Sequence, residues 1–172
     1  MKELHTLQWI ESTGGPLLLI EKNLLPAWCG YRFKEEGVLT DYERACKVLD
    51  YVGKVRIDDG YGLVLGEEPF ATTWYQPNSP GIGLIVRWVC AENETAVINA
   101  LYNLPDVPWE QTGVSLDLTT GDLILFDSSL PGSDIDDWLN LTVPRGSYSV
   151  ETLHFQPDKQ TSLILHRLLQ HI

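Results

Sequence analysis

Basic residues are scarce in this sequence, and the scarcity is concentrated in one part of the chain. Twelve Lys and Arg stand against 24 Asp and Glu, so the 172-residue chain carries a formal net charge of −12. From Trp88 to Pro144 there are ten acidic residues and no Lys or Arg. Phosphate contacts need basic side chains, so this composition argues against nucleic acids and anionic membranes as direct partners. The acidic stretch instead predicts a negative field that steers a basic partner.

Cysteine and long apolar runs are also rare. Cys29, Cys46 and Cys90 lie far apart and outside any CxxC pattern, which argues against a disulfide framework or a zinc site. No apolar run approaches the roughly 18 residues that a membrane-spanning helix needs. The opening residues, MKELHTLQ, lack the basic and apolar regions of a secretion signal, so we expect a cytoplasmic protein.

Catalytic motifs are missing as well. The sequence has no HExxH, no GxSxG and no GxxxxGK[ST]. The acids Asp134, Asp136 and Asp137 lack the glycine and closing glutamate of a calcium loop. We therefore expect no cofactor, no metal site and no catalytic residues. A pair of acids acting as in a glycosidase stays open, because the separation of two carboxylates is not visible in a sequence.

Short apolar or alternating runs, punctuated by Gly, Pro, Asn and Asp, dominate the chain and predict strands. These runs cover residues 9–12, 16–20, 54–57, 62–65, 83–90, 114–118, 122–126, 139–143, 147–155 and 161–168. Three glycine-containing turns at 13–15, 58–60 and 119–121 are typical of hairpins. The pattern predicts a mainly β protein, α+β at the margin, with antiparallel sheets built from hairpins in a sandwich- or barrel-like arrangement.

The three predicted hairpins resemble one another. Each contains a leucine-rich triplet after its turn, at residues 17–19, 63–65 and 123–125. Their unequal spacing argues against a regular solenoid or propeller. The sequence leaves two explanations open, a true internal repeat or the shared chemistry of tight turns.

Two amphipathic helices interrupt the strands. Thr40 and Glu43 have the spacing of a capping box, and the following apolar positions predict a helix over about 41–51. A second apolar stripe predicts a helix over about 93–104, ending before Pro105. We expect one domain over residues 1–172, with a division into two packed lobes near 105–113 left open.

Several tryptophans stand beside acids and turns. A loop Trp with neighbouring carboxylates is typical of a protein-binding hot spot with an acidic rim, and also of a platform for stacking sugars. Inward packing that closes the ends of the β core is the structural alternative. On this reasoning the candidate partner-binding residues are Asp134, Asp136, Asp137, Trp138, Glu67, Glu68 and Trp74.

Segments spread over nearly the whole chain resemble a known family. They are WIESTGGPLL at 9–18, WCG at 28–30, DYERAC at 41–46, LGEEP at 65–69, TW at 73–74, VRW at 86–88, LFDS at 125–128 and PRGSY at 144–148. Together they are similar to immunity protein 21 of bacterial polymorphic toxin systems. The final stretch, Thr161 to Ile172, carries little of this resemblance.

The resemblance implies a small intracellular protein, encoded beside a toxin, that binds the toxin domain and protects the cell. Such proteins are generally inhibitors and not catalysts, and the family brings no binding residues to transfer. We therefore expect a toxin-neutralising protein whose partner is a basic toxin domain, most simply a nuclease. The competing hypothesis is a carbohydrate- or small-ligand-binding β module that uses Trp74 or Trp138. The oligomeric state stays open.

Overall fold

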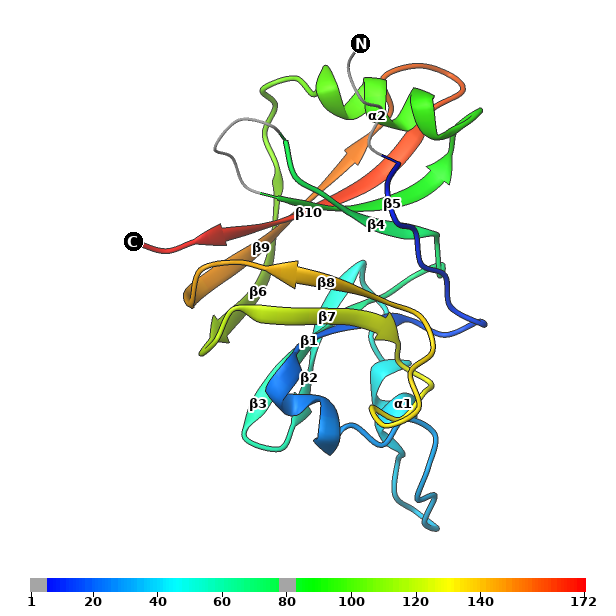
Figure 1. Ribbon diagram of the computed structural model, residues 1–172, viewed down its shortest axis with the longest axis vertical. Coiled ribbons are helices and arrows are strands. Elements are labelled where there is room, and N and C mark those ends of the chain that lie inside the picture. The colour runs from blue at the N-terminus through cyan, green and yellow to red at the C-terminus, as the bar shows by residue number, and fades with distance from the viewer. Residues whose placement is uncertain (1–5, 78–82) are drawn as a thin grey trace.

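Two five-stranded antiparallel sheets face each other in the computed structural model, which describes residues 6–77 and 83–172 (Figure 1). Sheet 1 has the order β2 (Val52–Ile57), β3 (Gly60–Leu65), β1 (Leu17–Glu21), β7 (Asp122–Asp127) and β8 (Trp138–Thr142). Sheet 2 has the order β4 (Thr72–Tyr75), β5 (Leu84–Cys90), β10 (Ser162–Gln170), β9 (Gly146–Phe155) and β6 (Glu110–Leu118). The prediction of a mainly β fold is confirmed, and the two sheets form an open sandwich and no closed barrel within the described residues.

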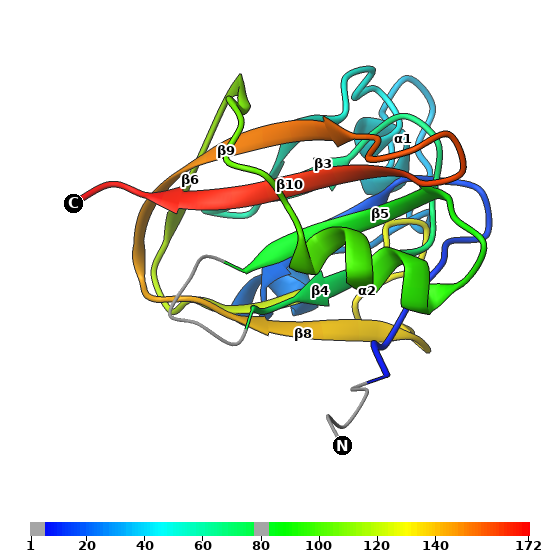
Figure 2. The same ribbon diagram turned by 90° about the horizontal axis from the view of Figure 1, so that it is seen from above.

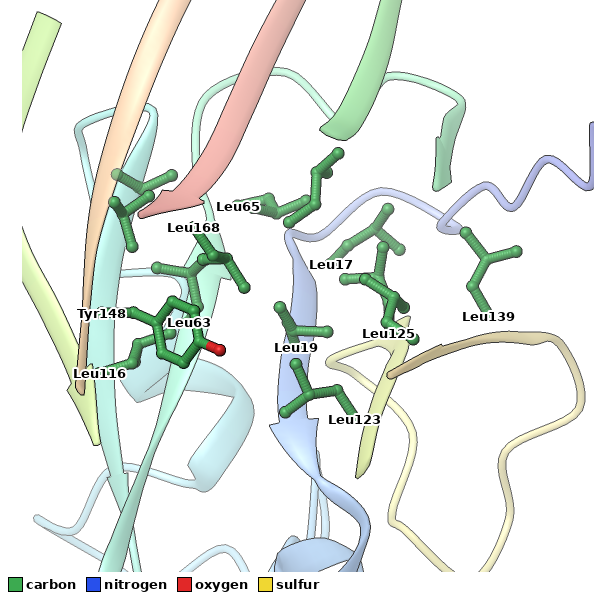
Figure 3. Packing of buried hydrophobic residues seen from close by; sticks show 14 of the residues in the cluster. Leu17, Leu19, Leu63, Leu65, Leu116, Leu123, Leu125, Leu139, Tyr148 and Leu168 are labelled. Carbon is green, nitrogen blue, oxygen red and sulfur yellow. The ribbon is translucent and has the colours of Figure 1, made fainter. Parts of the chain in front are cut away.

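The three leucine-rich triplets lie side by side at the centre of sheet 1. Leu19 of β1 pairs with Leu63 of β3 on one side and with Leu125 of β7 on the other. Leu17 and Leu19 face the interior between the sheets (Figure 3). Leu18 and Ile20 belong to the separate cluster on the outer face. A strand buried on both faces needs no polar positions, which explains why these runs do not alternate.

Helices cover the outer face of each sheet. Val97 and Leu101 of α2 (Glu94–Tyr102) pack against sheet 2, and Figure 2 shows α2 lying over that sheet. The 3-10 helix η1 (Lys22–Ala27) and α1 (Asp41–Ala45) contribute to the cluster on the outer face of sheet 1. The prediction of a helix over 93–104 is therefore confirmed apart from its ends.

The first helix is shorter than the predicted 41–51. The capping box is present, because Glu43 N–H donates to the Thr40 hydroxyl and Thr40 N–H donates to the Glu43 carboxylate. The helix nevertheless ends at Ala45, and Val48 then packs over Gly53 of β2. Leu49, which the pattern placed on the packed face, is 81% exposed. The helix thus ends before the amphipathic pattern does, and Val48 packs against β2 while Leu49 is exposed.

Only one of the three predicted hairpins exists. The turn at 58–60 joins β2 to β3 within sheet 1, as expected. The turn at 119–121 instead joins β6 in sheet 2 to β7 in sheet 1, and the turn at 13–15 precedes β1 after Ile10 has bridged to Thr72 of sheet 2. Glycine-containing turns reverse the chain in either case, so their chemistry does not reveal which sheet receives the next strand.

A buried carboxylate holds the turn that crosses between the sheets. The Glu21 carboxylate accepts backbone N–H hydrogen bonds from Thr119, Thr120 and Gly121, and it also accepts both threonine hydroxyls. Burial alone would raise the pKa of Glu21, but the hydrogen bonds led by Thr120 outweigh it and lower the pKa to about 2. An ionised Glu21 therefore fixes the crossing.

The strand β4 and the 3-10 helix η1 are absent from the sequence-based prediction. Strands from either side of residues 105–113 occur in both sheets. No helix in the described part of the chain is long and apolar enough to cross a membrane.

Candidate functional site

One side of the sandwich is formed by the edge strands β4 and β8, which lie against each other across the two sheets. The segment at 8–10 connects them. The Thr73 hydroxyl donates to the Gln8 carbonyl at 2.6 Å, and the Gln8 side-chain amide donates to the Trp138 carbonyl at 2.9 Å. Ile10 and Thr72 exchange two backbone hydrogen bonds of 2.9 Å. The N-terminal segment therefore links sheet 2 to sheet 1 along this side.

Three of the candidate residues line one polar pocket at the start of β8. Asp136, Asp137 and Trp138 border a cavity of about 350 Å³ together with Gln8 and Asn140. Trp138 is 39% exposed, and both carboxylates are exposed. Neither Asp136 nor Asp137 forms an ion pair with any described residue. This acidic pocket combines uncompensated negative charge with an accessible indole.

Asp134 belongs to the same loop but has a different environment. Its carboxylate forms an ion pair with Arg32 and accepts a hydrogen bond from the Ser133 hydroxyl at 2.8 Å. Its charge is therefore compensated locally, and it connects two surface loops.

Glu67 and Glu68 lie outside that pocket, on the connection between β3 and β4, and their side chains are exposed. A buried guanidinium fixes the backbone beneath them. Arg87 of β5 donates to the carbonyls of Gly66 and Glu68 at 2.5 and 2.7 Å, and to that of Tyr51 at 3.3 Å. Burial lowers the pKa of Arg87 to about 10, which leaves it charged at neutral pH. No pattern in the sequence indicated that this Arg would be buried.

Trp74 lines a separate cleft at the opposite end of β8. The cleft has a volume of about 560 Å³, and Val143, Tyr148 and Leu168 contribute to its walls. The indole is half-buried against the interior between the sheets and occupies the space over Gly83, where a Cβ would lie 2.1 Å from it. Trp74 and Trp138 therefore belong to different cavities.

The other tryptophans that stand beside turns or acids have structural roles. Trp28 is 1% exposed, and its indole N–H donates to the Ser128 carbonyl at 3.0 Å. The Trp109 ring lies 4.5 Å from the Arg167 guanidinium, which also forms an ion pair with Glu151. These rings complete packed clusters, and they form no accessible platform.

The acidic stretch from Trp88 to Pro144 does not form one face. Eight of its ten carboxylates are exposed, but they occur on elements far apart in the fold. Glu110 and Asp117 lie on β6, which packs against β2 and β3, whereas Asp136 and Asp137 precede β8 on the opposite side of the sandwich. The negative charge of this stretch is therefore distributed over more than one side of the sandwich.

A loop at residues 31–39 carries exposed apolar side chains that the sequence-based reasoning missed. Tyr31, Phe33, Val38 and Leu39 are 56%, 77%, 52% and 42% exposed. Figure 1 shows this loop projecting below α1. Apolar and charged residues alternate irregularly in this segment, with neither strand nor helix periodicity. The lack of periodicity is the feature that could have indicated a loop with exposed apolar side chains.

The comparison with known families matches the model of immunity protein 21 over residues 8–161. The chain belongs to the immunity protein 21 family. No curated protein and no solved structure matches it. The resemblance noted in the sequence is thereby confirmed, and the match ends just before β10.

Membership in the immunity protein 21 family identifies the general role, that of an immunity protein against a toxin. Proteins of this kind are generally inhibitors without enzymatic activity. Among the described residues, no three His, Cys, Asp or Glu side chains gather as metal ligands would. The family therefore implies a toxin as the partner.

Proposed function

We propose that this immunity protein neutralises a basic toxin domain, most simply a cytoplasmic nuclease encoded beside it, by binding it through acidic surface. The acidic pocket of Asp136, Asp137 and Trp138 carries the proposal, because it offers two unpaired carboxylates next to an accessible indole. Carboxylates of this kind accelerate the encounter with a basic partner, and an aromatic side chain stabilises the complex once it has formed. A nuclease fits because a phosphate-binding surface is basic.

The direct test measures binding of the purified protein to the toxin domain encoded by the neighbouring gene. We expect a complex of one to one, and we expect cleavage of DNA or RNA by that domain to stop at one equivalent. A toxin domain that binds but cleaves neither nucleic acid would contradict the nuclease assignment alone. Absence of binding would contradict the proposal as a whole.

The acidic-pocket part has its own test. The double variant Asp136→Asn/Asp137→Asn removes two charges, and Asp106→Asn/Glu110→Gln removes two exposed charges elsewhere. We expect the first variant to lower the association rate constant about fivefold at low ionic strength and to flatten its salt dependence, because local steering is lost. Equal rates and salt dependences for both variants would overturn the assignment of this pocket. Asp134 is left unchanged, because its replacement would release Arg32.

The cleft beside Trp74 supports a second candidate, a small-ligand or carbohydrate site. Its volume of about 560 Å³ lies in the range of small-molecule sites, and Trp74 and Tyr148 both line it. This second function would be favoured if the tryptophan fluorescence of the purified protein responds to a panel of glycans and the same protein does not bind the neighbouring toxin domain. A response that persists in Trp74→Leu would exclude the cleft as its origin.

A further inference from the structure

The 31–39 loop carries four exposed large apolar side chains, which we call the apolar patch. Its four large apolar residues, Tyr31, Phe33, Val38 and Leu39, are each between 42% and 77% exposed. Single exposed apolar side chains need no explanation in a protein, but a group of them on a projecting loop marks an interaction site.

The backbone of the loop is held in a conformation that displays the Phe33 ring. Phe33 has a φ of 60°, in the left-handed region that bulky residues rarely adopt. The neighbouring residues are tied down on both sides, because Arg32 pairs with Asp134 and Lys34 pairs with Glu43. Strain of this kind persists where the surroundings impose it, and it concentrates at functional positions.

The charges of the loop indicate which kind of partner surface can bind it. Arg32 and Lys34 are compensated by their partners, whereas Glu35 and Glu36 are exposed and form no ion pair with any described residue. Along the loop, the residues of the apolar patch flank these two acids on both sides, so the loop has an acidic tip. A second copy of this chain would bring two such tips and two net charges of −12 together, and an anionic membrane would repel the tip in the same way. A basic protein surface is the complementary occupant.

The loop also adjoins the acidic pocket. Tyr31 N–H donates to the Ser129 carbonyl at 3.0 Å, and the Arg32–Asp134 pair connects the loop to the segment that leads into Asp136 and Asp137. One partner surface can therefore contact the apolar patch and the unpaired carboxylates together.

We infer that the toxin domain anchors on the 31–39 loop, with the Phe33 ring in an apolar depression of a basic surface that surrounds Glu35 and Glu36. This inference rests on the proposed function and deepens it, because it names the anchor and the chemistry of the surface that accepts it. Preorganisation of the loop lowers the entropy cost of binding. The acidic pocket then steers the encounter, while Phe33 slows dissociation.

The test compares Phe33→Gly with Tyr102→Ala, using the neighbouring toxin domain as the probe. Glycine accepts the left-handed conformation and removes the ring, so the protein stays folded. Tyr102 is 70% exposed at the end of α2, and Figure 1 shows α2 at the opposite end of the molecule from the loop. We expect Phe33→Gly to weaken binding at least tenfold, mainly through a faster dissociation rate, and Tyr102→Ala to change it less than twofold.

The outcomes separate the two proposals. If the wild-type protein binds and Phe33→Gly binds equally well, the anchor is wrong and the proposed function stands. If the wild-type protein does not bind the toxin domain, the proposed function fails and the anchor fails with it. Analytical ultracentrifugation tests the remaining alternative. If the wild-type protein is a dimer and Phe33→Gly abolishes the dimer, a second copy covers the patch, and the toxin domain is not its occupant.

Discussion

The space between the two sheets has an apolar end and a polar end. At the apolar end, leucines of sheet 1 meet Tyr148 and Leu168 of sheet 2 (Figure 3). Further along β9 and β10, and on the neighbouring β5, the inward positions become Thr152, His166 and Arg87, all at most 2% exposed. The His166 Nδ1 lies 2.8 Å from the Thr152 hydroxyl, and both His166 Nε2 and Arg87 Nε are buried without a described partner. The side chains at one end contribute mainly through apolar packing, while those at the other depend on hydrogen bonds and charge.

The largest expected effect is at the apolar end. Leu19→Ala should lower the free energy of unfolding by about 4 kcal/mol, because Leu19 is 2% exposed between Leu63 and Leu125 and leaves a cavity that strands cannot fill. Urea denaturation measures the change. A loss below about 1 kcal/mol would mean that sheet 1 relaxes around the gap and that this end is loosely packed.

Replacement of the buried guanidinium probes the polar end. Arg87→Met should lower the free energy of unfolding by about 3 kcal/mol, because the carbonyls of Tyr51, Gly66 and Glu68 lose their donor. Arg56→Met, at an exposed Arg that donates to the Asp58 carbonyl, serves as the control and should cost below about 0.5 kcal/mol. If the two ends are independent, Leu19→Ala and Arg87→Met combine additively within about 0.5 kcal/mol.

The buried histidine at the polar end should make the free energy of unfolding depend on pH. Burial, then the charge of Arg87, then His154 lower the pKa of His166 well below 6.5. The unfolded chain therefore takes up a proton as the pH falls below about 6.5, whereas the folded chain does not, so stability is lost on acidification. We expect a loss of about 1 kcal/mol from this group between pH 6.5 and 5.5.

His166→Gln is the matched variant for this prediction, because Gln can still bond to the Thr152 hydroxyl. Its stability profile should be flatter from pH 6.5 to 5. Glu21 contributes mainly at lower pH, because its stabilising effect is lost between its ordinary pKa of 4.5 and its folded pKa of about 2. An unchanged slope in His166→Gln would show that the pH dependence originates elsewhere.

The smallest effect has the opposite sign and lies outside both ends. Phe33→Gly should raise the free energy of unfolding by up to about 1 kcal/mol, because the left-handed backbone is no longer strained. Gly37→Ala, at a φ of 77°, should lower it by a similar amount and is the reverse control. A destabilised Phe33→Gly, measured in the same urea titration, would show that the ring supports the fold.

Local patterns predicted most of the strands, since their apolar content follows directly from burial. The three leucine triplets lie on β1, β3 and β7, which are neighbouring strands of sheet 1, although two of the three predicted hairpins were wrong. The role of Arg87 was not predictable, because it depends on carbonyls that only the folded chain brings together. Of the candidate binding residues, Asp136, Asp137 and Trp138 share a pocket, and Trp74 does not join them.

The position of β10 makes the completion of sheet 2 depend on a late segment of the chain. This strand, residues 162–170, lies between β5 and β9, with Leu165 paired to Val86 on one side and to Leu153 on the other. While the chain is still emerging from the ribosome, β5 and β9 have nothing between them, and sheet 2 cannot close. A chain that stops before residue 162 therefore lacks the central strand of sheet 2, and its core is incomplete.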